Sequence, residues 1–351
     1  MMSVQTQSIA VLLVGLSHGF VAAEALTAGP DQFADPTQTT TTVSTPDTSG
    51  STTFNLQHRP QFGGAYSGVA KLAFGGTGCS GALLSDGLHL LTAAHCVAPN
   101  GVFSFSSGTA QFAITAGANI YTGVLDSVAI TSVLVHPGWT GNFISGGNDL
   151  AIVTLASTAP AGAARYGLYS GTADVGAVAT KSGWGLTGTG STGSSGGLEW
   201  RVGQNLWDTT LDFIEPSGSN KVLVYDFDDG TLLRDLFFRF GFTNSGLGSQ
   251  EIMAAPGDSG GPSFIGGQIA GIASFRYSYG TGFGDVDNVA NSSFGEMGGD
   301  TRVASFNSWI LSSIPEPASG WLYLAGLLTV GFVARRKRPT SAHDQTPAAL
   351  R

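Results

Sequence analysis

The stretch APGDSGGPSF, Ala255 to Phe264, places Ser259 among Gly257, Asp258, Gly260 and Gly261. Glycine is abundant in this chain, 52 of 351 residues, so a serine beside glycines says little by itself. A serine hydroxyl becomes a nucleophile only with a base that takes its proton, a group that orients this base, and donors for the oxyanion. The question is whether the rest of the chain supplies these parts.

The composition predicts an all-β fold. Charged residues make up only 11% of the chain, and short runs rich in Val, Ile, Thr and Phe alternate with Gly, Ser, Asn and Asp. This pattern is typical of short strands joined by tight turns. The net charge of -9, without a basic patch in the globular part, argues against nucleic acid as a partner. Strand-like runs are 65–74, 81–91, 127–135, 150–155 and 269–275, and one short helix is expected at 302–311.

The N-terminal region reads as a signal peptide followed by a spacer. Residues 1–25 contain an apolar run, Ile9–Leu16, followed by small residues, which is typical of a cleaved export signal. Residues 26–60 form a pro-segment or linker, because the Thr/Ser/Pro-rich stretch 35–53 has almost nothing to bury and is expected to be disordered.

The C-terminal region has three parts in order: a Pro-Glu-Pro turn, an uncharged run from Ala318 to Ala334, and a basic cluster from Arg335 to Arg338. Residues 314–338 resemble the PEP-CTERM sorting signal of Gram-negative bacteria. The resemblance implies export, a transient transmembrane helix, and removal of the tail by an exosortase. Residues 339–351 would then form a cytoplasmic tail, because basic clusters favour that side of the membrane.

Two residues could activate Ser259, one as the base and one as the group that orients the base. His95 lies in LLTAAHCVA directly before Cys96, and Asp149 lies in GGNDLAIVTL directly before an apolar run. Alone, His95 could equally be a structural histidine and Asp149 a turn residue. Cys79 and Cys96 are either free thiols or one disulfide, and export would favour the disulfide, which would pin the backbone beside His95.

Taken together, TAAHC, NDLA and GDSGGP occur in the order His, Asp, Ser, which is that of chymotrypsin-type enzymes. From Gln61 to Ser313 the chain resembles a trypsin-like (chymotrypsin-fold) serine protease. The resemblance implies two antiparallel six-stranded β-barrels with a cleft between them and a short C-terminal helix. It also implies a disulfide, because CSGALL at Cys79 resembles the strand whose cysteine bonds the one after the catalytic histidine.

The same resemblance assigns roles to the residues. His95 would be the general base and acid, Asp149 would orient it, and Ser259 would attack the carbonyl carbon. The backbone N–H groups of Gly257 and Ser259 would form the oxyanion hole. No metal or cofactor is expected to take part. Because a general base must be neutral, activity is expected to fall below roughly pH 6–7.

Specificity is expected to be non-tryptic. Met253 stands where tryptic enzymes carry an aspartate at the pocket floor, so an apolar or small side chain is expected there instead of Lys or Arg. Ser274, Phe275 and Arg276 match the segment that pairs with the substrate backbone. Arg276, where the family usually has glycine, would narrow the cleft or contact an acidic substrate residue, and Gly298 or Gly299 would keep one pocket wall open.

Three further expectations concern loops and activation. Residues 185–197 are expected to form a flexible loop, and 223–233 a hairpin with an Asp-Gly turn. Asp226, Asp228 and Asp229, or Asp285 and Asp287, could bind calcium, but without a full ligand loop they are read as turn residues. In the family that the chain resembles, activation often exposes a new Ile or Val amino terminus that pairs with the aspartate before the nucleophile, here Asp258, but this sequence contains no IVGG stretch.

The sequence thus predicts an exported serine endopeptidase that cleaves proteins or peptides through an acyl-enzyme on Ser259. Its other partners would be the export machinery and an exosortase, and its place the Gram-negative cell envelope or extracellular matrix, after transient anchoring in the inner membrane. The alternative is a catalytically idle matrix-binding module on a protease scaffold.

Overall fold

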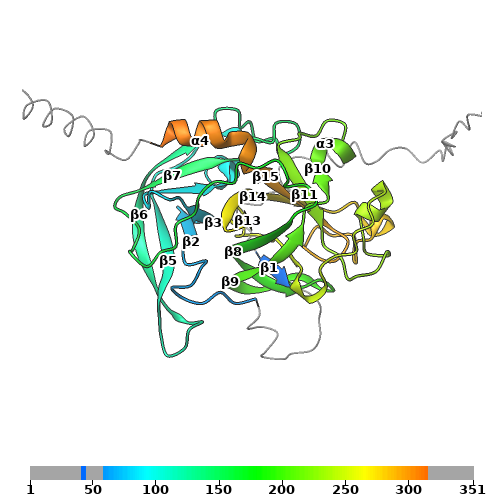
Figure 1. Cartoon of the computed structure of the whole chain (residues 1–351), viewed down its shortest axis with the longest axis horizontal. Helices are drawn as coiled ribbons and strands as arrows, with labels where there is room; N and C mark the ends of the chain where they lie inside the picture. The colour runs from blue at the N-terminus through cyan, green and yellow to red at the C-terminus, as the bar shows by residue number, and fades with distance from the viewer. Residues whose placement is uncertain (1–40, 45–57, 315–351) are drawn as a thin grey trace, which may run out of the picture.

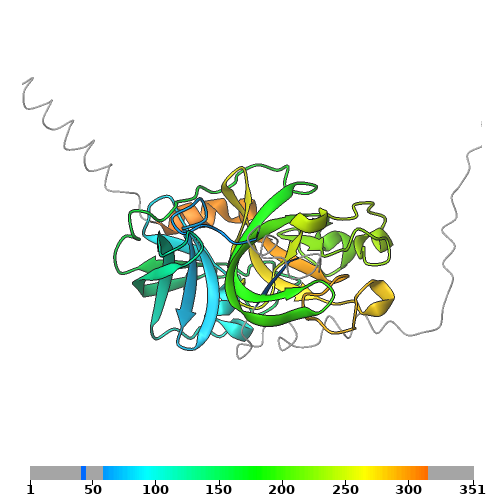
Figure 2. The ribbon, with the colours of Figure 1, turned by 90° about the horizontal axis from the view of Figure 1, so that it is seen from below.

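The computed structural model describes residues 41–44 and 58–314, which form two bodies of β-strands lying side by side (Figures 1 and 2). The strands are β1 (Thr41–Ser44), β2 (Val69–Phe74), β3 (Thr77–Leu83), β4 (His89–Thr92), β5 (Gly108–Ala116), β6 (Gly123–Val135), β7 (Ala151–Leu155), β8 (Val178–Thr189), β9 (Gly193–Leu206), β10 (Thr209–Thr210), β11 (Val222–Asp226), β12 (Ile252–Met253), β13 (Pro262–Ile265), β14 (Gln268–Tyr277) and β15 (Met297–Arg302). The helical segments are η2 (Ala94–Cys96), η3 (Pro99–Gly101), α3 (Leu211–Ile214), η4 (Phe237–Phe240), η5 (Gly248–Gln250), η6 (Thr281–Phe283), η7 (Val303–Phe306) and α4 (Asn307–Ser313).

The first body is a closed antiparallel barrel in the order β2-β3-β4-β7-β6-β5. It closes because β2 pairs with β3 on one edge and with β5 on the other. The central strand β7 has the sequence AIVTL and is buried at four of its five residues, as expected of a strand covered on both faces. This confirms one of the two six-stranded barrels that the sequence predicts.

The second body is a nine-stranded sheet in the order β10-β11-β15-β14-β13-β8-β1-β12, with β9 also paired to β8. The expectation of a second closed six-stranded barrel is therefore not met within the described residues. The reason lies in β8, whose first part pairs with β13 at Thr180 and Lys181, while its far end pairs with β1. Strand β1 comes from the Thr-rich segment expected to be disordered, and threonine favours strands when an unpaired sheet edge is available.

The predicted flexible loop at 185–197 is instead a hairpin made by β8 and β9, which is a correction of the sequence reading. The two strands pair as far as Thr189 and Gly193, with a shift of register between Leu186 and Gly188, and Gly193 adopts a φ of 66°. The tip is fixed to another part of the fold, because the Ser194 N–H donates to the Asn291 carbonyl at 2.7 Å. Small residues here permit close pairing of backbones instead of disorder.

The predicted hairpin at 223–233 is also wrong. Strand β11 ends at Asp226, and no return strand follows among the described residues. Instead, the carboxylate of Asp226 accepts the N–H groups of Leu236 and Phe237, and that of Asp228 accepts the N–H of Gly230. Side chains thus take the backbone donors that a second strand would have used.

The predicted short C-terminal helix is confirmed, as η7 followed by α4. It packs on the first barrel, where the His136 ring lies 5.0 Å from Phe306 and 4.8 Å from Trp309. Among residues 41–44 and 58–314, no helix has the length and apolar character needed to span a bilayer. The predicted signal peptide and the tail beyond Ile314 lie outside the described residues.

Candidate active site

His95 and Asp149 meet at the edge of the first barrel. Asp149 precedes β7 and is only 1% exposed, and its Oδ2 lies 2.7 Å from Nδ1 of His95. Its Oδ1 accepts the backbone N–H of His95 at 2.9 Å. The carboxylate therefore holds both the ring and the backbone of His95, and it can fix the tautomer in which Nε2 is free to accept a proton.

Ser274 contributes a third contact to this carboxylate. Its hydroxyl donates to Oδ2 of Asp149 at 2.5 Å from the middle of β14, in the second sheet. Thr301 of β15 donates to the Asp149 carbonyl at 2.9 Å. Asp149 is thus held by both bodies of the fold. The sequence predicts Ser274 only as part of the substrate-binding segment, because nothing in it reveals that this side chain turns toward Asp149.

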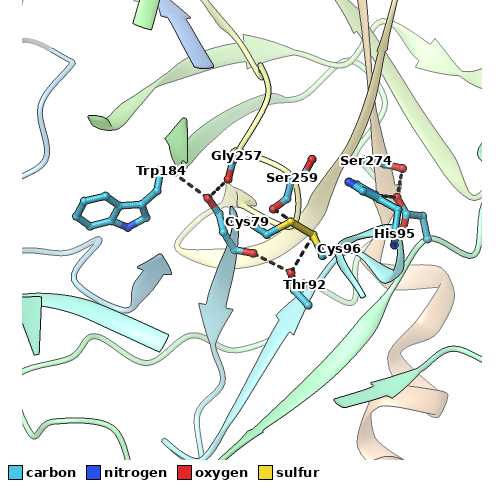
Figure 3. The surroundings of a disulfide bond; sticks show 10 residues. Cys79, Thr92, His95, Cys96, Trp184, Gly257, Ser259 and Ser274 are labelled. Atoms are coloured by element: carbon cyan, nitrogen blue, oxygen red, sulfur yellow. Dashed lines mark hydrogen bonds and ion pairs between the residues drawn. A yellow bond between two sulfur atoms is a disulfide. The ribbon is translucent and has the colours of Figure 1, made fainter. Parts of the chain in front are cut away.

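Ser259 lies in the turn between β12 and β13. Its carbonyl accepts the N–H of Ser80 at 2.8 Å, which ties the turn to β3 of the first barrel. Figure 3 shows that the imidazole of His95 points toward Ser259. Within the described residues no hydrogen bond joins the Ser259 hydroxyl to the imidazole. Such bonds often tighten only when substrate binds, so this geometry is compatible with proton transfer.

The turn around Ser259 presents free backbone donors. Within the described part of the chain, neither the N–H of Gly257 nor that of Ser259 donates to a protein acceptor. The positive φ of Gly257, 98°, is a conformation that L-residues with side chains rarely adopt. The Gly257 carbonyl is turned away, where it accepts the Ser80 hydroxyl at 2.5 Å. Two donors are therefore available for an oxyanion.

A disulfide between Cys79 and Cys96 lies directly beneath this turn (Figure 3). It joins β3 to η2 and so fixes the segment that carries His95. Ligand atoms of Cys79, Cys96 and His95 lie within 4.8 Å of one another, but disulfide sulfurs offer no thiolate to a metal ion. The grouping is therefore structural.

Asp258 is packed against the glycines of the sequence SGWG, residues Ser182–Gly185 of β8. A Cβ on Gly183 would lie 2.2 Å from Oδ1 of Asp258, and one on Gly185 would lie 2.6 Å from Oδ2. The Asp258 carboxylate also accepts the N–H of Ala255 at 3.1 Å. Glycine is needed in β8 because the carboxylate lies directly on the strand, and this contact anchors the turn that carries Ser259.

The region expected to form the specificity pocket is more filled than the sequence suggested. Met253 is fully buried in β12. Gly298 does not leave an open wall, because a Cβ there would lie 2.2 Å from the ring of Tyr225. The hydroxyl of this tyrosine accepts the N–H of Ala254 at 3.3 Å, and burial raises its pKa well above the usual value. Tyr225, which the sequence analysis did not single out, therefore occupies this space.

Arg276 and Phe275 follow Ser274 on β14. Phe275 is buried, and its ring lies 6.1 Å from Phe143, which in turn lies 5.5 Å from His95. The guanidinium of Arg276 donates from Nε to the Ala290 carbonyl at 3.0 Å. Arg276 thus holds the 290–296 loop in place. The sequence predicts a narrowed cleft or a contact with the substrate for Arg276, but not this structural role.

Comparisons with known proteins agree with this geometry. The family model described as Trypsin matches residues 57–310. The bovine protein "Chymotrypsin-like elastase family member 1" is 26% identical over 241 residues, covering 67% of this chain and 78% of its own length. "Trypsin beta" of Drosophila erecta is 25% identical over 241 residues, with 68% and 79% covered. "Trypsin delta" of Drosophila melanogaster is 26% identical over 245 residues, again with 68% and 79% covered.

Proposed function

The chain belongs to the trypsin family of serine endopeptidases, and we propose that it cleaves peptide bonds through an acyl-enzyme on Ser259. The observation that carries the proposal is the bond from His95 to the buried carboxylate of Asp149, on the side of the domain where the Ser259 turn lies. The Ser274 contact supports the proposed reaction, because the Ser274 hydroxyl joins Asp149 to the second sheet, the body that also carries the Ser259 turn.

In the proposed reaction, Nε2 of His95 takes the hydroxyl proton of Ser259 as its oxygen attacks the substrate carbonyl carbon. Asp149 stabilises the imidazolium that forms, and the N–H groups of Gly257 and Ser259 stabilise the oxyanion. His95 then gives the proton to the leaving amine, and water releases the acyl group by the reverse sequence. Removing one oxyanion donor typically costs about a hundredfold or more in rate.

We further propose that specificity is non-tryptic. The support is chemical: Met253 supplies no anion for Lys or Arg, and Tyr225 takes up space at Gly298. We expect the substrate pocket at this place to be shallow and apolar, which favours small or apolar side chains before the scissile bond. Widening it with Tyr225→Ala should therefore shift preference toward larger apolar residues.

Export and transient anchoring are also proposed, from the patterns at residues 1–25 and 314–338. The disulfide supports export, because such bonds persist in oxidising compartments. N-terminal sequencing and intact mass of the exported form test this directly. A mature chain that keeps residues 1–25 or the tail would contradict it.

Cleavage of a peptide library by the purified chain and by its Ser259→Ala variant tests the proposed reaction. Mass spectrometry should find cleavage by the wild-type chain after small or apolar residues and none by the variant. A folded wild-type chain that cleaves nothing would favour the idle binding module instead.

A further inference from the structure

Ser80 of β3 joins the first barrel to the turn that carries Ser259. It follows Cys79 in the sequence and is fully buried. Its hydroxyl contacts backbone groups from two other parts of the chain: it donates to the Gly257 carbonyl at 2.5 Å, and it accepts the N–H of Trp184 in β8 at 2.8 Å. Figure 3 shows both bonds as dashed lines, one from Gly257 and one from Trp184.

The direction of the Ser80 hydroxyl is settled by these two partners. A backbone N–H can only donate, a carbonyl can only accept, and a serine hydroxyl has one proton to give. The N–H of Trp184 therefore takes up a lone pair of the hydroxyl oxygen, and the hydroxyl proton points at the Gly257 carbonyl. Because the bond to Gly257 is buried, water does not readily replace it.

The backbone of Ser80 holds the other end of the same segment. Its N–H donates to the Ser259 carbonyl at 2.8 Å, and its own carbonyl accepts the Thr92 hydroxyl at 2.8 Å. The carbonyls of Gly257 and Ser259 are therefore both bonded to one residue of the first barrel. Since these carbonyls lie on either side of Asp258, the two bonds fix how the backbone curls from Gly257 to Ser259.

Gly257 is the residue of this segment that most needs an outside contact. It has a φ of 98° and no side chain to restrict the rotation of its backbone. Within residues 41–44 and 58–314, its carbonyl accepts no hydrogen bond other than that of the Ser80 hydroxyl. If this hydroxyl were absent, the buried carbonyl would rotate toward another donor, and the neighbouring N–H groups would move with it.

We propose that Ser80 is a positioning residue for the oxyanion hole: its hydroxyl keeps the N–H groups of Gly257 and Ser259 aimed at the carbonyl oxygen of the substrate. Donors stabilise an oxyanion best when they are held in place before the charge develops. Ser80 acts through the backbone of the turn, because its one hydroxyl proton is already given to Gly257. The inference rests on the proposed function, since these donors matter only if an oxyanion forms at Ser259.

Steady-state kinetics of Ser80→Ala test the proposal, because this substitution removes only the hydroxyl. For a chromogenic peptide amide with an apolar residue before the scissile bond, kcat should fall about 10- to 100-fold, while KM should change less than about threefold. The split is expected because the two N–H groups bind the oxyanion more strongly than the carbonyl oxygen of the bound substrate. A residue that only stabilises the fold would not lower kcat of the folded chain in this way.

Ser67→Ala is the matched control. The Ser67 hydroxyl belongs to a fully buried residue, donates to the Gly162 carbonyl at 3.1 Å and accepts the N–H of Ala164 at 3.0 Å. It thus makes the same two kinds of bond as Ser80, between segments that do not include the Ser259 turn. Ser67→Ala should lower the urea midpoint about as much as Ser80→Ala, but it should leave kcat unchanged.

Thr92→Val is the second variant, used if Ser80→Ala does not fold. It keeps the volume of the side chain but removes the hydroxyl that holds the Ser80 carbonyl, so kcat should fall in the same direction and by a smaller factor. A folded Ser80→Ala or Thr92→Val chain that keeps the wild-type kcat would overturn the proposal. So would an equal loss of kcat in Ser67→Ala, because the effect would then be one of general stability.

Hydrogen exchange of residues 255–261, read by mass spectrometry, adds a measurement that needs no activity. It uses full chains that also carry Ser259→Ala, which prevents self-cleavage. Exchange at the bonded N–H groups of Gly260 and Gly261 should be faster with Ser80→Ala than without it, and unchanged by Ser67→Ala. A wild-type chain without hydrolysis would count against the proposed function, and this comparison would then decide whether Ser80 holds the turn; unchanged exchange would overturn that as well.

Discussion

At the scale of single residues, Asp149 has a double role, because it holds the backbone and the ring of His95 together. Asp149→Asn should keep the fold but present an amide that favours the wrong imidazole tautomer. We expect kcat to fall roughly 10⁴-fold, the magnitude of the serine-protease template. Ester-hydrolysis kinetics would measure it, with the exposed Asp126→Asn as control. A loss below tenfold would mean that Asp149 does not orient His95.

Gly260 shows how tightly the turn around Ser259 is confined. Its φ is 79°, and a Cβ would lie 2.1 Å from Oγ1 of Thr92 and 2.4 Å from the Ser80 carbonyl. Gly260→Ala should displace the turn and abolish hydrolysis, and it should cost more than 2 kcal/mol of unfolding free energy, estimated roughly from strain plus overlap.

The matched control is Gly266→Ala, with a φ of 56° and no atom within 4 Å of the added Cβ. It carries only the conformational penalty, of order 1 kcal/mol. Urea unfolding and peptide hydrolysis of both variants would separate strain from overlap. Equal effects at the two positions would show that the space around Gly260 is not critical.

At the scale of elements, the Cys79–Cys96 disulfide ties β3 to η2 across a sequence separation of 17. Replacing both cysteines by alanine should cost about 3 kcal/mol on the chain-entropy account. Urea denaturation of the variant and of the oxidised wild-type chain measures the difference. Because η2 carries His95, hydrolysis should also decline under conditions where the variant remains folded; unchanged kinetics would restrict the disulfide to a stabilising role.

At the scale of the whole molecule, five buried carboxylates predict an unusual pH dependence; this acidic cluster consists of Asp208, Asp226, Asp228, Asp235 and Glu251. Burial raises the pKa of Asp228 to about 6, of Asp208 to about 7 and of Glu251 to about 8. Carboxylates whose pKa is higher in the fold than in the unfolded chain stabilise in acid, and this contribution is lost as pH rises from about 4 to 8. The neighbouring charge of Asp229 also raises the pKa of Asp228, while that of Arg239 lowers the pKa of Asp235, which burial raises.

The Ser259→Ala chain should therefore be more stable near pH 5 than near pH 8, and urea unfolding at the two pH values measures the difference. His136, whose pKa is lowered by burial and by Lys221, opposes this trend. The comparison of wild type with Asp208→Asn isolates the acidic cluster, since the variant retains His136. Identical pH profiles for the two chains would refute the assignment.

Local patterns predicted much of the fold and the residues of the candidate site. Short apolar runs located strands such as β7, and the motifs around His95 and Asp149 named two side chains that the fold joins by a hydrogen bond. Contacts made only by folding were not predictable: Tyr225 filling the space at Gly298, and carboxylates from Asp208 to Glu251 meeting at one end of the sheet. Flexibility was wrongly inferred for 185–197, because glycine permits tight strand pairing as readily as disorder.

The central claim is that Ser259 is an activated nucleophile, and active-site labelling tests it most directly. A fluorophosphonate probe should modify the folded chain, and peptide mapping by mass spectrometry should find the label on Ser259. Ser259→Ala should remain unlabelled, and His95→Ala should label far more slowly because the base is missing. A folded wild-type chain that stays unlabelled, or is labelled equally well without His95, would contradict the account.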